Sequence, residues 1–310
     1  MFSRILVPLD GSPLAQAVLA MATTIALAEG ATLTLLAVSD SKFKGDKGMS
    51  ADDLEFVAGQ LGAHDIAVEV RTARGEPGPT IVDIAKEEGF DLIAMCTHGR
   101  TGLSRMIRGS VSDYVLHHTD TPLLMMRPAA VGTDQEEERV PFELKEVLVP
   151  LDGSPAGEMA LPYGAHLART MGVPLHLVRV ATVIAYPADA SMVAGMGAYT
   201  KETAALEQQV YDMAARYLEE VKAQPVLSRV SVKASTRWGT PGHVITEIAE
   251  ATPGTLVVLT THARSGIART VLGSVTETIV RNSHAPTLVL GPAMVEQAAQ
   301  TKTEGKPIAK

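Results

Sequence analysis

An Asp-Gly-Ser-Pro segment follows a short apolar run twice in this chain, at Asp10 and again at Asp152. A carboxylate at such a position can accept hydrogen bonds from the hydroxyl groups of a ribose or from the edge of a base. Farther along each copy, Gly109 and Gly273 stand directly before a serine and a helix-length segment. Glycine allows a ligand to approach the backbone closely, and the first N–H groups of a helix favour phosphate. Together these features indicate a mononucleotide site.

The same residues also allow structural roles. Asp-Gly-Ser is common turn chemistry, so each aspartate could do no more than fix a turn. We favour a binding role for Asp10 and leave both roles open for Asp152. No catalytic role is assigned to His98, because no Ser or Cys partner with a third orienting group is evident. Cys96, which ends an apolar run, is typical of a small core residue, and its place at the ligand edge keeps a minor redox role open.

The positions of these motifs show that the chain is a tandem duplication. ILVPLDGSP at 5–13 matches VLVPLDGSP at 147–155, an offset of 142 residues. THGRTGLSRMIRGSV at 97–111 matches THARSGIARTVLGSV at 261–275, an offset of 164. The second copy therefore carries 22 additional residues, which we place at about 181–203. We expect them to lengthen the helix that ends at Lys222 and to precede it with a Met- and Gly-containing loop at 191–199.

Short apolar runs alternate with helix-length segments in both copies, which predicts parallel strands joined by right-handed crossovers. The expected strands are 3–9, 31–38, 65–72, 90–96 and 121–127 in the first copy and 145–151, 173–180, 230–236, 255–260 and 285–291 in the second. A helix is expected over 14–29, with Ser12 as its N-cap and Gly30 at its end. Each copy is thus predicted to be one five-stranded, doubly wound α/β domain that binds ligands at the carboxyl ends of its strands.

Composition excludes several classes of protein. The net charge is −8, no run of Lys or Arg occurs, and aromatic residues make up only 4 % of the chain. A nucleic-acid partner is therefore not expected. A single cysteine and the lack of clusters with metal-ligand spacing predict neither a disulfide nor a metal site. Because we find no signal-peptide pattern and no apolar stretch of spanning length, we expect a cytoplasmic protein without a membrane partner.

The domain boundaries follow from the duplication and from local composition. We expect a first domain at 1–130, an acidic linker at 131–144, a second domain at 145–292 and a flexible tail at 293–310. The linker is polar and carries five acidic residues and one basic residue, with little apolar periodicity. The chain is therefore predicted to consist of two domains of similar fold joined by a short segment.

These repeated motifs resemble those of the universal stress protein family, as two copies that cover nearly the whole chain. The resemblance rests on the aspartate after the first strand and on a Gly-x2-Gly-x9-Gly-Ser/Thr loop, which in the nucleotide-binding branch of the family holds ATP. It implies a Rossmann-like, adenine-nucleotide-binding fold with strand order 3-2-1-4-5 and helices on both faces of the sheet. It also implies that two such domains pair through their last strands, here within one chain, and we expect two chains to form a homodimer.

The resemblance implies a nucleotide site in the first copy and a second one at the equivalent positions of the second copy. Asp10 would contact ribose and adenine, and the backbone of Val38 would contact adenine. The first site comprises Pro8, Leu9, Asp10, Val38, Cys96, His98, Gly99, Arg100, Gly109, Ser110 and Val111, and the second comprises Asp152, Val180, Thr260, Ala263, Gly273, Ser274 and Val275. In the first copy Cys96 stands at the position of the first glycine of the loop. In the second copy Thr260 and Ala263 stand at the positions of the first and second glycines. We therefore expect the first copy to bind ATP more tightly.

Two function classes remain. The first is a stress-response protein that binds ATP, with or without Mg²⁺, as a nucleotide-dependent regulatory module with little or no hydrolysis. The second is a nucleotide-free scaffold for protein partners, because some members of the family lack the glycine motif and do not bind ATP. A hydrolase or kinase is less favoured, since the sequence contains neither a Gly-x4-Gly-Lys-Ser/Thr loop nor an evident metal-binding carboxylate pair.

Overall fold

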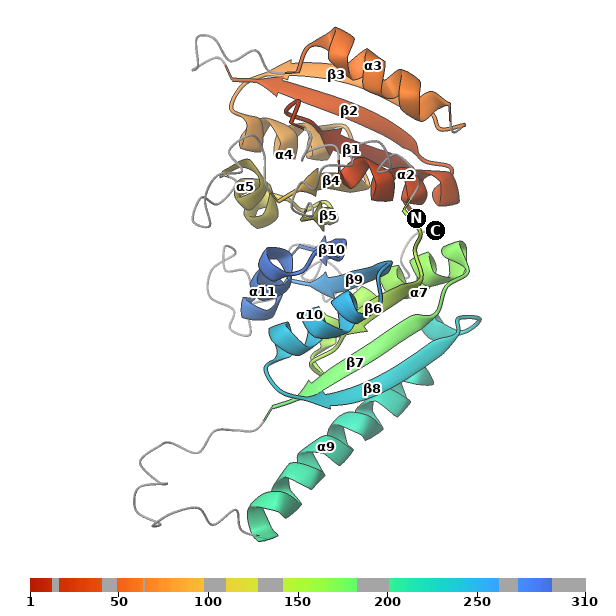
Figure 1. Ribbon diagram of the computed structural model, residues 1–310, viewed down its shortest axis with the longest axis vertical. Coiled ribbons are helices and arrows are strands. Elements are labelled where there is room, and N and C mark those ends of the chain that lie inside the picture. Colours follow the sequence, from red (N-terminus) through yellow and green to blue (C-terminus); the bar gives the residue numbers. More distant parts are fainter. Residues whose placement is uncertain are drawn as a thin grey trace, which may run out of the picture.

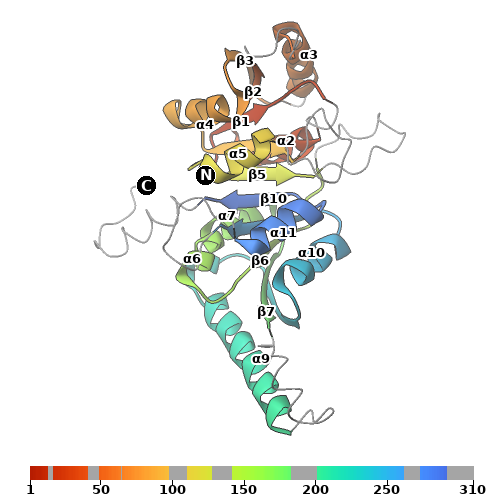
Figure 2. The ribbon, with the colours of Figure 1, turned by 90° about the vertical axis from the view of Figure 1, so that its left-hand side faces the viewer.

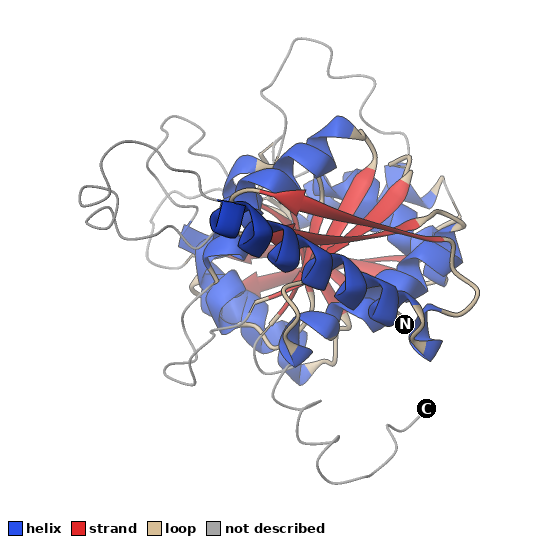
Figure 3. Ribbon diagram, turned by 90° about the horizontal axis from the view of Figure 1, so that it is seen from below, coloured by secondary structure: helices blue, strands red, loops and turns tan. Residues whose placement is uncertain are grey.

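The computed structural model describes residues 1–12, 17–40, 49–63, 65–97, 110–127, 142–182, 201–261 and 273–291, without the side chains of 110 and 201–203. Strands and helices alternate in both repeats, and helices cover both faces of the sheet (Figures 1 and 3). The elements of the first repeat are β1 (Arg4–Pro8), α2 (Val18–Glu29), β2 (Thr32–Ser39), α3 (Ala51–Gly62), β3 (Val68–Arg74), α4 (Pro77–Glu87), β4 (Leu92–Cys96), α5 (Ser110–His118) and β5 (Leu123–Met126).

The second repeat has the same order of elements, with a short additional helix. Its elements are β6 (Glu146–Pro150), α6 (Pro155–Glu158), α7 (Ala160–Met171), β7 (Leu175–Ala181), α9 (Lys201–Lys222), the 3-10 helix η1 (Pro225–Leu227), β8 (Val232–Trp238), α10 (Pro241–Ala251), β9 (Thr255–Thr260), α11 (Ser274–Asn282) and β10 (Thr287–Leu290). The strands begin and end within three residues of the runs expected from the sequence, which confirms the predicted fold class.

The strands of the described residues form one ten-stranded sheet in the order β3-β2-β1-β4-β5-β10-β9-β6-β7-β8. Each half is parallel and has the predicted order 3-2-1-4-5. The halves meet where β5 and β10 pair in antiparallel register, with Leu124 opposite Leu288 (Figure 2). Pairing through the last strands, within one chain, is thus confirmed, and the two predicted five-stranded sheets are continuous with each other.

Alternating side chains along the strands fill a separate core on each face of the sheet, as period-2 geometry requires. In the first repeat, Leu33 and Leu35 of β2 pack with α2 and α3, whereas Leu36 packs with α4 and α5. The core cluster on the α2 side also contains Leu124 of β5 and Leu288 of β10. The apolar core on this face therefore continues from one repeat into the other.

A glycine ends the 12-residue helix that precedes the second strand of each repeat. Gly30 follows α2 with φ +65°, as predicted, and Gly172 follows α7 with φ +69°. The predicted start at Ser12 is not confirmed, because the described helix begins at Val18 and residues 13–16 lie outside the described part. In the second repeat the hydroxyl of Ser154 accepts the N–H of Gly157 (3.0 Å) and caps α6, a separate short helix before α7. The helix expected after the first strand is therefore divided there.

The insertion lengthens the helix after the second strand, as expected, because α9 has 22 residues and its counterpart α3 has 12. Leu218 and Val221 of α9 are buried, and at an offset of 164 they correspond to the buried Leu54 and Val57 of α3. The additional turns therefore precede this shared region. In Figure 1 they extend past the end of β7, away from the body of the second repeat.

Three predicted segments lie wholly or largely outside the described residues, namely the loop at 191–199, the tail at 293–310 and most of the linker. The described end of the linker packs on the first repeat. Phe142 and Leu144 lie against the core, and the Phe142 carbonyl accepts a hydrogen bond from the Thr24 hydroxyl of α2 (3.0 Å). The linker therefore contacts the first repeat immediately before it enters the second.

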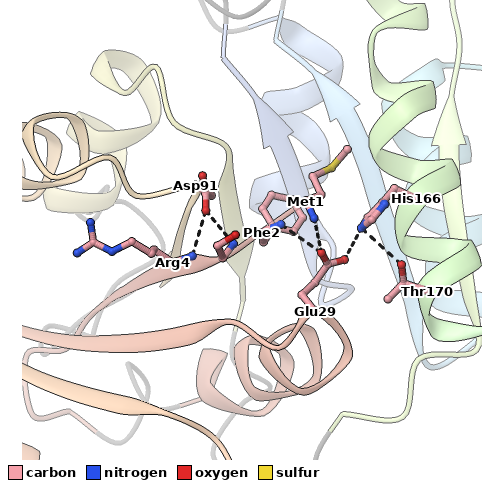
Figure 4. A network of polar contacts seen from close by, with 8 residues as sticks. Met1, Phe2, Arg4, Glu29, Asp91, His166 and Thr170 are labelled. Carbon is pink, nitrogen blue, oxygen red and sulfur yellow. Dashed lines mark hydrogen bonds and ion pairs between the residues drawn. The ribbon is translucent and has the colours of Figure 1, made fainter. Parts of the chain in front are cut away.

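A buried carboxylate joins the two repeats at their α2 and α7 helices. Glu29 of α2 accepts hydrogen bonds from the Met1 amine (2.6 Å) and the Phe2 N–H (3.2 Å), and its other oxygen contacts Nε2 of His166 on α7 (Figure 4). Burial by itself raises the pKa of Glu29, but these hydrogen bonds outweigh it and hold the pKa below the ordinary value of 4.5. The ionised form of Glu29 is therefore favoured in the folded protein.

We expect Glu29→Gln to lower the free energy of unfolding at pH 7 by about 1–2 kcal/mol, because hydrogen bonds to a charged group are replaced by weaker ones. A carboxyl with a lowered pKa in the folded state contributes stability above its unfolded pKa and loses it as the pH falls through the folded value. The difference between wild type and variant should therefore shrink below about pH 4.5. Urea unfolding at several pH values measures this. Glu55→Gln, at an exposed position of α3, is the control. The prediction would be contradicted if the difference in unfolding free energy between wild type and Glu29→Gln did not change with pH.

Candidate functional site

A cavity of about 750 Å³ lies at the carboxyl edge of the second repeat. Its walls come from the ends of β6, β7 and β9, the first turns of α10 and α11, and the middle of α9. Six of the seven residues predicted for this site line it, namely Asp152, Val180, Thr260, Gly273, Ser274 and Val275. The seventh, Ala263, lies outside the described residues. The volume is within the range of pockets that hold small molecules and cofactors.

Both predicted aspartates have a structural role in the turn after their strand. Oδ1 of Asp152 accepts the N–H (2.9 Å) and the hydroxyl (2.6 Å) of Ser154, and Oδ1 of Asp10 accepts the N–H of Ser12 (2.9 Å). In each repeat the glycine between the aspartate and the serine has φ near +80°. The turn-forming role left open by the sequence is thus present. Because an ionised carboxylate has about four acceptor positions, this role is compatible with a ligand contact.

The start of α11 supplies the N–H groups expected at the phosphate end. Gly273 precedes the helix in an extended conformation, and among the described residues no side chain caps the helix start. The first-turn N–H groups and the positive end of the helix dipole therefore lie at the wall of the cavity. The hydroxyl of Thr276 donates to the Thr260 carbonyl (3.4 Å), which ties this turn to the end of β9.

The first repeat brings its described site residues to the same edge of the sheet. β1 lies between β2 and β4, so Pro8, Leu9 and Asp10 follow the central strand. Val38 lies near the end of β2, Cys96 ends β4, and Val111 lies in the first turn of α5. His98, Gly99, Arg100 and Gly109 lie outside the described residues, and Ser110 is described only as the first residue of α5.

Cys96 is a buried thiol beside the aspartate of the first repeat. Burial, together with the nearby charge of Asp10, raises its pKa to about 12. The reactive thiolate is therefore scarce at neutral pH. The structure therefore supports the role of a buried core residue for Cys96. It does not support the minor redox role that the sequence left open.

The cavity of the second repeat contains functional candidates that sequence reasoning missed. Arg179 of β7 lines it, as do Val210, Met213 and Ala214 of α9. The guanidinium carbon of Arg179 lies 4.4 Å from the ring centre of Tyr217, also on α9. The sequence contained a usable signal, because Arg179 of the second repeat corresponds to Ala37 of the first.

Within the described residues, no group of three or more His, Cys, Asp or Glu side chains is arranged to hold a metal ion. The helices of the described part include none that is long and apolar enough to cross a membrane.

The fold and the site define a class of α/β protein in which two doubly wound repeats share one sheet and the carboxyl ends of the parallel strands of each repeat meet at one edge. The chain belongs to the universal stress protein family, whose family model matches residues 1–127 and 143–291. A universal stress protein of Mycolicibacterium smegmatis is 26 % identical over 243 residues, which is 77 % of this chain and 74 % of that protein.

Two crystal structures show the same fold across both repeats. A universal stress protein from Archaeoglobus fulgidus matches with a TM-score of 0.65 and 24 % identity, over 93 % of this chain and 98 % of the other. A functionally unknown protein from Pseudomonas aeruginosa matches with a TM-score of 0.68 and 17 % identity, over 98 % of each chain. At these identities the likeness establishes the fold alone.

Proposed function

We propose that this protein binds an adenine nucleotide, in the first place ATP, at the carboxyl edges of its repeats, and that the bound nucleotide sets its conformation or its choice of partner. The observation that carries the proposal is the cavity of the second repeat, which is lined by six residues selected from the sequence as a nucleotide site. Its carboxylate turn and its uncapped helix start suit the ribose and phosphate groups of such a ligand.

The two repeats are expected to differ in affinity. Loop glycines allow the backbone to approach phosphate, and the first repeat retains Gly99 and Gly109, whereas Thr260 and Ala263 replace both loop glycines in the second. We propose that the first repeat binds ATP more tightly, with little or no hydrolysis, because the sequence offers no evident base to activate water. The division into domains at 1–130 and 145–292, a homodimer and a cytoplasmic location are further parts of this proposal.

Calorimetric titration with ATP tests the proposal. We expect a tighter site that Asp10→Ala and Gly109→Ala each weaken by about tenfold, which corresponds to about 1.4 kcal/mol. We expect Asp152→Ala to weaken only the second site. A thermal shift at millimolar ATP provides an independent readout, because a ligand of the folded state stabilises it by mass action. The proposal would be refuted if titration with millimolar ATP released no heat of binding and ATP did not raise the unfolding temperature.

The second candidate function is a nucleotide-free scaffold, which the loss of loop glycines at Thr260 and Ala263 favours. The simplest discriminating observation uses protein purified without added nucleotide and then denatured by heat. Chromatography of the supernatant should detect released adenine nucleotide if the binding function is correct. If the supernatant contains none and ATP fails to stabilise the chain, the scaffold function is favoured.

A further inference from the structure

Arg179 places a positive charge in the wall of the second repeat's cavity, close to the Asp152 turn. It lies near the end of β7, beside Val180, whose counterpart in the first repeat is Val38. A Cβ atom on Gly153 would lie 2.7 Å from Nη1 of Arg179, so the guanidinium group packs directly against this turn. The charge is therefore at the end of the cavity that carries the aspartate.

The arginine and the aromatic ring beneath it are particular to the second repeat. At an offset of 142 residues the counterpart of Arg179 is Ala37, and at an offset of 164 the counterpart of Tyr217 is Asp53. Asp53 has a different role, because it forms a capping box with Ser50 at the start of α3. The Arg179–Tyr217 pair is thus a difference between two otherwise equivalent sites.

A short network of side chains holds the pair in place. The guanidinium lies over the Tyr217 ring, an arrangement in which the cation is attracted to the face of the ring. The Tyr217 hydroxyl donates to Oε1 of Glu158 (2.9 Å), and the Gln224 amide donates to Oε2 of the same carboxylate (3.0 Å). The position of Arg179 is therefore fixed before any ligand binds.

The guanidinium group has five N–H donors in a planar arrangement that matches the oxygens of phosphate. Within the described parts of the chain, the ring of Tyr217 is its partner, and no hydrogen bond or ion pair from it to an acceptor there is observed. A cation in a cavity wall is best stabilised by an anionic acceptor that enters the cavity. Arg179 thus suits a ligand with a negative group close to the Asp152 turn.

We propose that Arg179 makes the second repeat selective for a nucleotide that carries a phosphate on its ribose. This inference rests on the proposed function, in which Asp152 faces the ribose and the start of α11 faces the phosphates of the 5′ chain. A phosphate at the 2′ or 3′ position of the ribose is attached to a different ring carbon from the one that carries that chain, so it adds a second, separate anionic group. The second repeat, which lacks both loop glycines, then binds the ribose phosphate through Arg179 and the 5′ phosphate through α11.

Two isomers provide a matched test, because adenosine 3′,5′-bisphosphate and ADP have the same atoms and differ in the position of one phosphate. Both are titrated by calorimetry into the full chain carrying Asp10→Ala and Gly109→Ala, which together weaken binding to the first repeat by about a hundredfold if their effects add. We expect the bisphosphate to bind at least about tenfold more tightly than ADP, the effect of one charge-assisted pair of hydrogen bonds. Circular dichroism verifies that each variant is folded.

Adding Arg179→Met should bring the ratio of the two dissociation constants close to one. Arg281→Met is the matched control, because it removes the same charge from α11 outside the cavity, and it should leave the ratio unchanged. If both isomers bind with equal affinity, or if ADP binds more tightly, the inference is wrong while the proposed function stands. If neither isomer binds and ATP does not bind either, the proposed function of this repeat fails and the inference fails with it.

Discussion

Leu288→Asp is expected to lower the free energy of unfolding of the whole chain by more than about 4 kcal/mol. Leu288 is fully buried and lies opposite Leu124 where β10 pairs with β5. Both leucines belong to the core cluster that continues from one repeat into the other. An aspartate at this position would bury a carboxylate among apolar side chains, and the ionised group has no compensating partner there. Urea unfolding followed by circular dichroism measures the loss.

Leu206→Asp provides the control for this prediction, because Leu206 is 49 % exposed on α9 and an added charge there remains in water. It should change the unfolding free energy by no more than about 0.5 kcal/mol. The shared core also predicts that the unfolding of the first repeat responds to a change made in the second. If the wild type unfolds in two separate steps and Leu288→Asp shifts only one of them, the two repeats do not stabilise each other.

The sequence predicted the fold well because the fold depends on signals that repeat along the chain. Buried strands such as Leu92–Cys96 are continuous apolar runs, and Gly30 and Gly172 mark helix ends at equivalent positions. The predicted start of the first helix at Ser12 stays a prediction, because the described helix begins at Val18 and residues 13–16 lie outside the described part.

The candidate site was predictable where it follows from topology, and less so where it depends on packing. Asp152, Gly273 and Ser274 could be placed at one edge because the carboxyl ends of parallel strands meet there. Arg179 and Tyr217 belong to no motif, and their contact depends on how α9 packs against β7. Comparison of the two repeats identifies both positions as different, but only the three-dimensional arrangement shows that they meet.

Gly242→Val is expected to lower the free energy of unfolding by about 3 kcal/mol and to weaken nucleotide binding to the second repeat. Gly242 lies in the first turn of α10, where that helix contacts α11, and a Cβ atom there would lie 2.7 Å from the Cβ and Cγ2 atoms of Thr278. Thr278 cannot move its Cβ without moving the backbone of α11. Because Gly242, Thr278 and Ser274 all line the cavity, a displaced α11 also moves the N–H groups expected to bind phosphate.

Gly59→Ala on α3 is the matched control, because a Cβ atom at Gly59 meets no atom within 4 Å. Alanine has a higher helix propensity than glycine, so this variant should be more stable by about 0.5–1 kcal/mol. The two substitutions therefore have opposite expected signs, which urea unfolding resolves directly. The first repeat has an equivalent close contact, with a Cβ atom on Gly78 at 2.9 Å from the Tyr114 ring. If Gly242→Val is tolerated without loss of stability or affinity, the contact between α10 and α11 does not position the site.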